Sequence, residues 1–237
     1  MKQTSPANHL IARLPGHDRR LFLAQCVRVD LALSQVLAEP DRNVGHVYFP
    51  VDSFISLLTV VSGSVGLEVG MVGREGMLGA HLLLGVEAAP LHAMVQGPGT
   101  AWRMDAATFA AELERSAPLR REIGLYVHIL MRQMATSAGC IRYHEIGPRL
   151  ARWLLMSQDR AGADTFRMTQ EFLGFMLGVR RVGITEAAGA LQRAGLIEYR
   201  RGRVTVLDRP GLEAAACNCY QVDLRSYAKL LPAAAGA

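Results

Sequence analysis

TQEFLGFMLGVRRVGITEAAGALQRAG, residues 169–195, is the stretch that decides the fold of the C-terminal part of this chain. Thr169 is a good helix N-cap, and Gly178 lets the chain turn with a positive φ at no steric cost. A second helix is predicted from about Arg181 to Arg193, and Gly195 ends it. The apolar positions of the two helices are Phe172, Leu173, Met176, Leu177, Ile184, Ala187, Ala188 and Leu191. Two short helices joined by a glycine turn predict a helix-turn-helix.

A basic hairpin is predicted directly after these helices, in the segment LIEYRRGRVTVLD. Two short strands, 197–199 and 204–206, flank a turn that holds Arg200, Arg201 and Arg203. Guanidinium groups at such a tip neutralise phosphates and fix the register on a duplex, but they carry little sequence information. The segment therefore predicts a wing beside the helix-turn-helix.

The excess positive charge of the chain lies in its C-terminal third. The 237 residues include 26 basic and 21 acidic side chains, a net charge of +5. Residues 140–209 hold 12 Arg and 7 acidic residues, so this third carries the whole excess. The second helix opens with Arg180 and Arg181, and the first turn of a recognition helix is the part that meets base edges in the major groove. Charge alone is equally compatible with a solvated basic face, but with the helix pair and the hairpin it predicts binding to double-stranded DNA.

The N-terminal part has the pattern of a β domain. Residues 8–25 favour short helices broken at Pro15-Gly16. From 27 to 104, short β-branched and aromatic runs alternate with turn residues at intervals of about ten, which is typical of an all-β sandwich or barrel. The run FISLLTVV at 54–61 is almost continuously apolar, so we expect this strand to be buried on both faces.

A long helix is predicted between the two parts. Asp105 is a good N-cap for a short first helix, and Pro118 suits the first turn of the next one. Apolar residues then recur at spacings of three and four, which predicts an amphipathic helix of about five turns. Such a helix often pairs with its own copy, so we predict a homodimer; the alternative is that the helix packs back onto the β domain. The predicted dimer interface consists of Leu119, Ile123, Tyr126, Leu130 and Met134.

Composition and motifs exclude several classes of protein. Half of the residues are hydrophobic and 20% are charged, as in a globular protein. The N-terminus lacks the apolar core of a signal peptide, and no run approaches 18 uncharged apolar residues, so we expect a cytoplasmic protein without a membrane span. Nucleotide-binding loops, nucleophile elbows and zinc-protease motifs are lacking from the sequence. We therefore predict no enzymatic activity and no catalytic residue.

The segment Met168–Asp208 resembles the winged helix of Crp/Fnr-type transcription regulators. Two further stretches, HVYFPVDSFISLL and EVGMVGREGMLGAHLLLG, resemble the β-roll of the same family, in a branch with a divergent effector domain. The resemblance covers roughly residues 8–220. It implies an α+β fold with an N-terminal cyclic-nucleotide-binding-like β-roll (jelly-roll-like), a long dimerisation helix and a C-terminal winged helix-turn-helix. It also implies a homodimer that binds a palindromic DNA site and acts on RNA polymerase.

The resemblance carries the DNA contacts of the family over residue by residue. Thr169 and Gln170 match the phosphate-contacting start of the first helix, and Arg181 matches the guanine-reading arginine of the second. Val182 and Glu186 depart from the best-studied member, which has glutamate and arginine there, so a different half-site is expected. The predicted DNA-contacting residues are Thr169, Gln170, Arg180, Arg181, Thr185, Glu186, Arg200, Arg201 and Arg203.

The effector domain departs further from the cyclic-nucleotide binders of the family. These hold the ribose with a glutamate after a glycine, and the phosphate with an Arg-Ser pair. Here Leu78-Gly79-Ala80 lacks the glutamate, and Glu87–Met94 contains no arginine. Burying an unpaired charge costs on the order of several kcal/mol, so we expect that cAMP is not the ligand and that an unknown small molecule, or none, acts here. Arg74-Glu75 is the nearest charged pair, and it is also compatible with a simple turn.

The cysteines carry no predicted function. Regular disulfide spacing is lacking, which favours a reduced compartment. The oxygen sensors of the family hold an iron–sulfur cluster on cysteines near the N-terminus, where this chain has only Cys26. Cys217-Asn218-Cys219 is spaced more tightly than the usual Cys-x-x-Cys ligand pair. We therefore expect a structural or inert pair rather than a redox switch, and we predict no metal and no cofactor.

The sequence thus divides into four predicted segments. They are a β-roll effector domain at 8–113, a dimerisation helix at 114–143, a winged helix-turn-helix at 144–220 and a C-terminal tail at 221–237. Two functions remain open: a DNA-binding regulator gated by an unknown ligand or by none, and a small-molecule-sensing β-roll whose winged helix contacts another protein. They differ in binding to random duplex DNA, which depends steeply on salt for a DNA binder.

Overall fold

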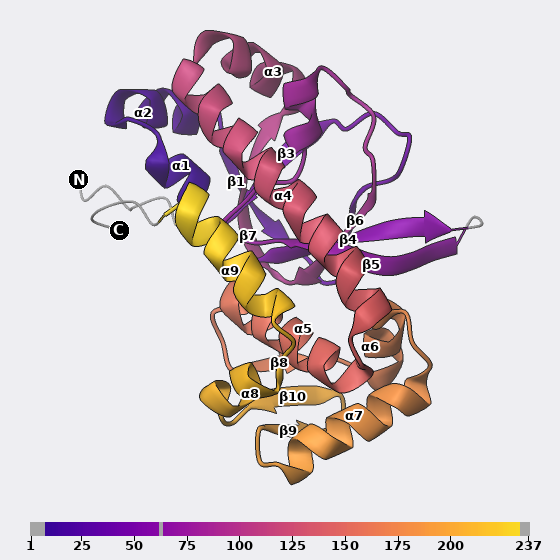
Figure 1. Cartoon of the computed structure of the whole chain (residues 1–237). Helices are drawn as coiled ribbons and strands as arrows, with labels where there is room; N and C mark the ends of the chain where they lie inside the picture. The colour runs from indigo at the N-terminus through magenta and orange to yellow at the C-terminus, as the bar shows by residue number, and fades with distance from the viewer. Residues whose placement is uncertain (1–7, 62–63, 233–237) are drawn as a thin grey trace. The chain divides into compact units, whose positions relative to one another are not determined.

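The computed structural model describes residues 8–61 and 64–232, coloured along the chain in Figure 1. The chain splits into two compact units, each built from separate stretches of sequence. Unit 1 contains Met1–Leu57, Met71–Met131 and Ser226–Ala237, and unit 2 contains Leu58–Gly70 and Arg132–Arg225. Strands are concentrated in the first half of the chain and helices in the second, so the fold is α+β as predicted.

Two short helices begin the described chain, α1 at His9–Arg13 and α2 at Gly16–Ala24. The fully buried side chain of Asn8 caps α1 by accepting two backbone N–H groups of its first turn. The amide of Asn8 also donates to the carbonyl oxygens of Pro50 (3.0 Å) and Gly76 (2.9 Å), which ties the helix to two β segments. The predicted break between the two helices is confirmed.

The strands of the β domain form two sheets, with the orders β1-β7-β3 and β2-β6-β4-β5. In the first sheet β7 pairs antiparallel on both edges, with Val27 opposite Arg103 and His46 opposite Asp105. The alternation of short strands and turns therefore gives the predicted β-roll. The elements are β1 Val27–Leu31, β2 Val36–Ala38, β3 His46–Pro50, β4 Phe54–Val61, β5 Ser64–Val72, the 3-10 helix η1 Ala80–Leu84, β6 His92–Gly97 and β7 Gly99–Asp105.

The apolar runs of the sequence form the core of unit 1. Phe49 lies at its centre, with ring centroids 5.2 Å from Phe22 and 6.0 Å from Phe109 in edge-to-face arrangements. In β4 every residue from Phe54 to Leu58 is buried, as expected of a strand covered on both faces, whereas Val60 is 41% exposed. The expectation for FISLLTVV thus holds for its first five residues.

Helices α3 (Ala106–Arg115) and α4 (Ala117–Tyr143) follow the last strand of the roll. Asp105 caps α3 as predicted, and its carboxylate accepts two N–H groups at 3.0 and 3.2 Å. Helix α4 has 27 residues and is longer than predicted. Its buried side continues through Ser137 and Cys140, which lie beyond the predicted apolar residues.

The predicted dimer interface needs a correction. Leu119, Ile123 and Tyr126 are only 2%, 0% and 0% exposed, and they pack in the core of their own unit 1. Leu130 is partly buried and packs against the same core. These residues follow the alternative left open by the sequence, in which α4 packs back onto the β domain. A periodic apolar stripe shows which face of a helix is buried, but not what covers it.

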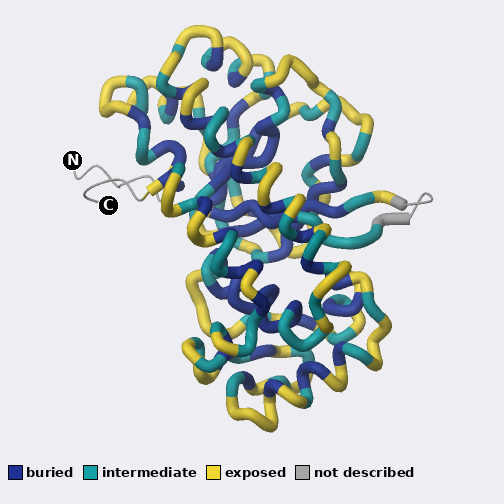
Figure 2. The backbone as a smooth tube through the Cα atoms, in the orientation of Figure 1, coloured by how far each residue is buried: buried dark blue, intermediate teal, exposed yellow. Residues whose placement is uncertain are grey.

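Unit 2 combines helices with a small sheet of order β8-β10-β9. Helix α5 is buried from Arg149 to Ser157 (Figure 2). Its Arg152 forms an ion pair with Asp223, with Nη2 and Oδ2 2.6 Å apart, and its Trp153 donates to a carboxylate oxygen of Glu68 at 2.9 Å. The elements are α5 Ile146–Ala161, β8 Thr165–Arg167, α6 Gln170–Leu177, α7 Arg181–Arg193, β9 Ile197–Arg200, β10 Arg203–Val206, α8 Arg209–Ala215 and α9 Cys219–Leu230.

The predicted tail at 221–237 is wrong over its described part, because helix α9 occupies most of it. This helix begins in unit 2, where Asp223 pairs with Arg152, and ends in unit 1, where Leu231 is 8% exposed and belongs to the core. Residues 233–237 lie outside the described residues. Within the described residues, no helix combines the length and hydropathy that crossing a bilayer requires.

Candidate nucleic-acid interface

Helices α6 and α7 form the predicted helix-turn-helix with the predicted bounds. The hydroxyl of Thr169 accepts the N–H of Phe172 at 3.1 Å and caps α6. Gly178 ends α6 in the left-handed region, at φ 63°, and Gly195 follows α7 at φ 73°. These local signals fix both helices, because each cap satisfies backbone groups that a helix end otherwise leaves without a partner.

The turn between the helices is packed closely. Ile184 and Leu191 of α7 are buried, as are Leu173 and Met176 of α6. A Cβ atom placed on Gly174 would lie 2.9 Å from the carbonyl oxygen of Val179, within contact distance of the backbone of the turn. The apolar faces predicted from the sequence therefore hold the two helices together.

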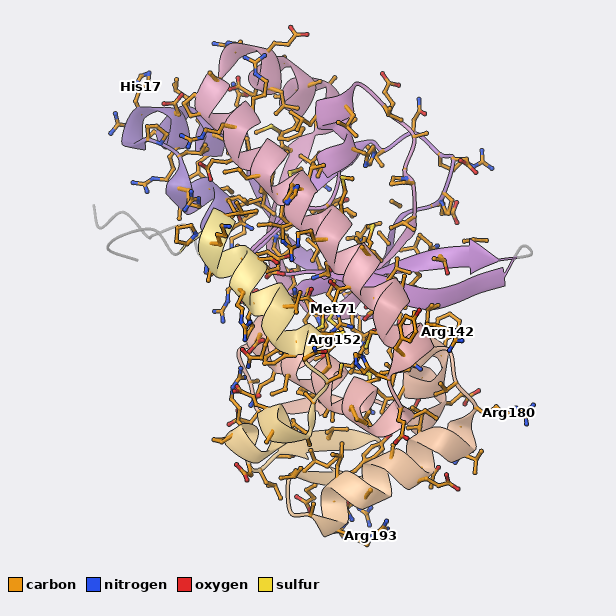
Figure 3. The ribbon with its side chains drawn as sticks, in the orientation of Figure 1. His17, Met71, Arg142, Arg152, Arg180 and Arg193 are labelled. Carbon is orange, nitrogen blue, oxygen red and sulfur yellow. The ribbon has the colours of Figure 1, made fainter. Side chains whose placement is uncertain are left out.

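The opposite side of α7 is open to solvent. Arg181 and Thr185 are exposed one turn apart, and Val182 is 61% exposed between them. The hydroxyl of Thr185 donates to the side-chain oxygen of Gln170 at 2.7 Å, which links this face to the first turn of α6. Figure 3 shows Arg180 and Arg193 at opposite ends of α7, so the basic start of the helix is separated from its end.

The hairpin of β9 and β10 is the predicted wing, and its turn is tighter than predicted. Arg201 and Gly202 form a two-residue turn with φ values of 51° and 70°, the pattern of a type I′ hairpin. The Tyr199 hydroxyl donates to the carbonyl oxygen of Met168 at 2.7 Å and fixes the wing to the start of the helix-turn-helix. Burial raises the pKa of Tyr199, although the charge of Arg181 opposes this, so the phenol keeps the proton that this bond needs.

A surface hollow of about 310 Å³ lies where α6, α7 and the wing meet. Arg181 and Arg201 contribute positive charge from two sides, and the first turn of α6 contributes the positive end of a helix dipole. A concave surface of this kind suits a phosphate group. The lining residues are Thr169, Gln170, Glu171, Arg181, Tyr199, Arg201 and Gly202.

This geometry coincides with a match to a known family. Residues 148–215 match the Crp-like helix-turn-helix domain. This part of the chain is similar to the DNA-binding domain of Crp-type regulators. A search of curated proteins finds no match to the chain.

Solved structures share the fold of most of the chain. A crp/fnr-family regulator from Eubacterium rectale has a TM-score of 0.66 at 15% identity, covering 85% of this chain and 94% of its own. FixK2 from Bradyrhizobium japonicum has a TM-score of 0.66 at 14% identity, covering 81% and 98%. The c-di-GMP responsive global regulator CLP from Xanthomonas campestris has a TM-score of 0.65 at 17% identity, covering 81% and 99%. At such identities the likeness concerns the fold.

The predicted DNA-contacting residues fall into three places. Four of them, Thr169, Gln170, Arg181 and Arg201, line the hollow. Thr185 and Glu186 are exposed on α7, and Arg180 is exposed at its N-cap. Arg200 and Arg203 are exposed on the wing. The sequence did not indicate Tyr199, because its role depends on a hydrogen bond to a residue 31 positions away.

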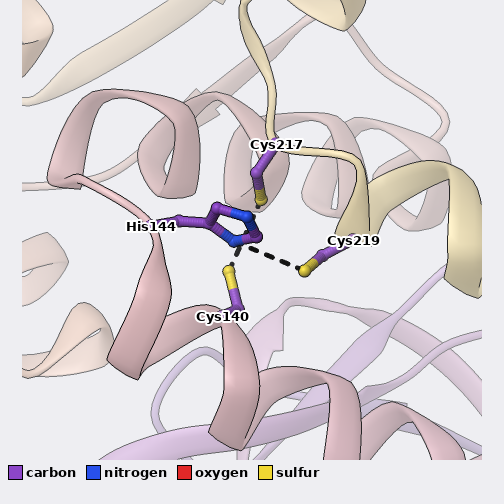
Figure 4. A group of neighbouring side chains, drawn as sticks. All are labelled: Cys140, His144, Cys217 and Cys219. Atoms are coloured by element: carbon purple, nitrogen blue, oxygen red, sulfur yellow. Dashed lines mark hydrogen bonds between the residues drawn. The ribbon is translucent and has the colours of Figure 1, made fainter.

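The sequence prediction also missed a second group of side chains in unit 2. Cys140, His144, Cys217 and Cys219 lie together (Figure 4), and their ligand atoms are all within 4.8 Å of one another. The spacing of Cys140 and His144, four residues apart at the end of α4, was the available local signal. The proximity of Cys217 and Cys219 to this pair depends on the tertiary fold.

Proposed function

We propose that this regulator binds a palindromic DNA site sequence-specifically as a homodimer, with α7 in the major groove. The observation that carries the proposal is the hollow between α6, α7 and the wing, which joins an exposed Arg181 at the helix start to Arg201 at the wing tip. The first residues of a recognition helix meet base edges, and a basic wing meets phosphates.

Different roles follow for the basic residues. Arg181 is exposed at the first position of α7, where a guanidinium group can make two hydrogen bonds to a guanine. Thr185 and Glu186, one turn further on, face the same side and set the remaining preference. Arg200, Arg201 and Arg203 lie at the hairpin turn and neutralise phosphates, as Thr169 and Gln170 do at the start of α6. Arg180 precedes the helix and contacts the backbone of the same half-site.

The dimer interface that we propose lies beside most of the stripe predicted from the sequence and shares Met134 with it. A second apolar stripe follows α4 at alternating spacings of three and four, which is the heptad pattern of a coiled coil. Its Met131 is 65% exposed and its Met134 is half-buried, so both can contact a second copy. The stripe consists of Gly124, Val127, Met131, Met134, Ala138 and Ile141.

The β-roll is proposed to respond to a ligand other than a cyclic nucleotide, or to none. The segment in which the family clamps the phosphate here begins with Glu87, whose carboxylate accepts a hydrogen bond from Asn43 at 2.9 Å. Gly79 adopts φ 98° and lies so close to Val47 that a Cβ atom there would be 2.6 Å from a methyl group. A carboxylate at this place disfavours a phosphate. Calorimetric detection of micromolar cAMP binding would contradict this part of the proposal.

The family resemblance further supports a cytoplasmic protein that acts on RNA polymerase from its DNA site. The competing function, in which the winged helix contacts a protein, lacks an observation of its own. Sequence-specific binding to DNA would distinguish the proposed function from the competing one.

The test begins with selection of bound sequences from a random duplex pool. Affinities for the selected site and for a scrambled duplex are then measured over a range of salt concentrations. We expect Arg201→Ala to weaken both complexes alike and to lower the slope of log K against log salt by about one per lost phosphate contact. Arg181→Ala should instead reduce the preference for the selected site, by about 1–3 kcal/mol per half-site.

Arg193→Ala is the matched control, because it removes the same charge from the far end of the same helix. It should keep both the preference and the salt slope. A wild-type protein that selects no sequence and shows a flat salt dependence would overturn the proposed function. Equal loss of affinity for both duplexes in Arg181→Ala would overturn the assignment of the base-reading residue.

A further inference from the structure

Three cysteines and a histidine converge in unit 2, outside the DNA-contacting surface. Cys140 is 2% exposed, Cys217 7% and Cys219 8%, and His144 is half-buried beside them. The sulfur atoms of Cys140 and Cys217 are 3.5 Å apart, and Nδ1 of His144 is 3.6 Å from the sulfur of Cys219. Figure 4 shows the four side chains pointing toward a common centre.

Local structure explains how each pair is presented. The N–H of His144 donates to the carbonyl oxygen of Cys140 at 3.1 Å, so the last turn of α4 places both side chains on one side. Cys217 and Cys219 flank the exposed Asn218, and Cys219 is the first residue of α9. The N–H of Cys217 donates to the carbonyl oxygen of Pro148 at 3.3 Å, which brings this segment to the start of α5. The tight Cys-x-Cys spacing allows Cys217 and Cys219 to contact one ion, because the local backbone directs both sulfur atoms to the same point.

The distances suit one small ion. Zinc–sulfur bonds of about 2.3 Å in a tetrahedron place ligand atoms about 3.8 Å from one another. The S–S separation of 3.5 Å and the N–S separation of 3.6 Å are close to this value, and no pair among the four ligand atoms exceeds 4.8 Å. We propose that Cys140, His144, Cys217 and Cys219 bind one Zn²⁺ in a closed tetrahedral site with a structural role.

The charges around the four residues support a site of this composition. Three thiolates and a neutral imidazole around Zn²⁺ carry one net negative charge. Arg149 is 7% exposed and donates to the carbonyl oxygen of Leu177, and in the described part of the chain no carboxylate pairs with it. Burial lowers the pKa of Arg149, and charge on Cys140 and Cys217 opposes this shift. A thiolate site therefore supplies the negative charge that a buried guanidinium group needs.

The buried guanidinium group of Arg152 is already neutralised by a carboxylate, so it does not change the net charge of the zinc site and Arg149. Arg152 forms an ion pair with Asp223, with Nη2 and Oδ2 2.6 Å apart. The pair adds no net charge to the site. One anionic zinc site and Arg149 then cancel each other inside unit 2, and no charge in this group stays buried without compensation.

Other interpretations of the four residues fit less well. An iron–sulfur cluster holds its ligands on separate iron atoms, so the ligand atoms would stand further apart than in this group. A disulfide between Cys140 and Cys217 would need a bond of about 2.05 Å, whereas the sulfur atoms are 3.5 Å apart and all four cysteines are free. Four protein ligands leave no open position for a substrate, which distinguishes a structural zinc site from a catalytic one.

The site would join segments that are far apart in sequence. It ties the end of α4 to the turn between α8 and α9, 77 residues further along the chain. Structural zinc contributes its binding free energy to folding, because the unfolded chain has no preformed site. The zinc would therefore stabilise unit 2 without touching the hollow that contacts DNA.

The test uses the full chain, made in zinc-supplemented medium and purified without a polyhistidine tag. Elemental analysis should find one zinc per chain. Exchange with Co²⁺ should give the intense visible bands of a tetrahedral thiolate site, and a chelator should lower the melting temperature.

Cys219→Ser removes one ligand, and Cys26→Ser is the matched control because Cys26 lies in unit 1. Losing an outer-shell partner already costs about 10–100-fold in metal affinity, so Cys219→Ser should lose more than this and Cys26→Ser nothing. Should Cys219→Ser fail to fold, the cobalt spectrum of the wild type decides alone. A metal-free wild type, a Cys140–Cys217 disulfide, bound iron, an octahedral cobalt spectrum, or equal zinc affinity in the two variants would overturn the proposal.

Discussion

His81 shows how one buried atom can make a domain sensitive to acid. It is half-buried in η1, and its Nε2 atom is buried with no hydrogen-bond partner among the described residues. Burial lowers the pKa of His81, and a hydrogen bond with the backbone of Glu87 opposes this shift only in part. Protonation would place a positive charge at a buried position without a partner, so folding favours the neutral ring.

The free energy of unfolding should therefore fall as the pH drops below 6.5, the ordinary pKa of histidine. In that range the unfolded chain binds a proton that the folded chain resists, at a slope of up to about 1.4 kcal/mol per pH unit. Urea unfolding at pH 7.5 and 5.5 measures this, and His81→Gln should lose less stability than wild type. His17→Gln, an exposed control labelled in Figure 3, should behave as wild type. Equal acid sensitivity in all three proteins would refute the assignment.

At the scale of elements, two glycines of the helix-turn-helix allow the effect of close packing on stability to be measured apart from the effect of helix propensity. Gly174 and Gly189 both lie inside helices, where alanine is favoured by about 1 kcal/mol. A Cβ atom on Gly174 would meet the backbone of Val179 at 2.9 Å. A Cβ atom on Gly189 would meet only the end of the flexible Arg193 side chain, at 3.3 Å.

Gly189→Ala should accordingly raise the free energy of unfolding by up to about 1 kcal/mol. Gly174→Ala should lower it by about 1–3 kcal/mol, since the clash forces the turn between α6 and α7 apart. It should also weaken DNA binding, because the start of α7 moves. Chemical denaturation compares the two variants, and a Gly174→Ala protein as stable as Gly189→Ala would show that the turn tolerates the extra methyl group.

The same elements show what a sequence can and cannot predict. The bounds of α6 and α7 follow from Thr169 and Gly178, which act on their immediate neighbours. The sequence predicts a tail in place of helix α9 because the stabilising partners of this helix, such as Arg152 for Asp223, are 71 residues away. The cysteine and histidine group was missed for the same reason. Periodicity located the apolar face of α4 correctly, but the occupant of that face is decided by tertiary packing.

Assembly belongs to the scale of the whole molecule. If two copies meet along the stripe containing Met131 and Met134, a charge at its most exposed position should separate them. Met131→Glu should sediment as a monomer and should lose about a hundredfold or more in affinity for a palindromic site, since the gain from joining two binding units disappears. His128→Glu introduces the same side chain at an exposed position outside the stripe and should remain a dimer. A monomeric wild type that binds the palindrome tightly would exclude this arrangement.

The interleaved composition of the two units has a consequence for synthesis on the ribosome. Domains usually fold one after another as the chain emerges, N-terminal domain first. Here the last segment of unit 1 begins at Ser226, after all of unit 2 has been made. The two segments of unit 2, Leu58–Gly70 and Arg132–Arg225, are separated by a segment of unit 1. Each unit therefore needs a segment that is synthesised after part of the other unit. The hairpin strands β4 and β5 are translated long before α5, whose Trp153 bonds to Glu68. Neither unit can close until α9 has left the exit tunnel, and a chain stalled before that helix would remain a substrate for chaperones and proteases.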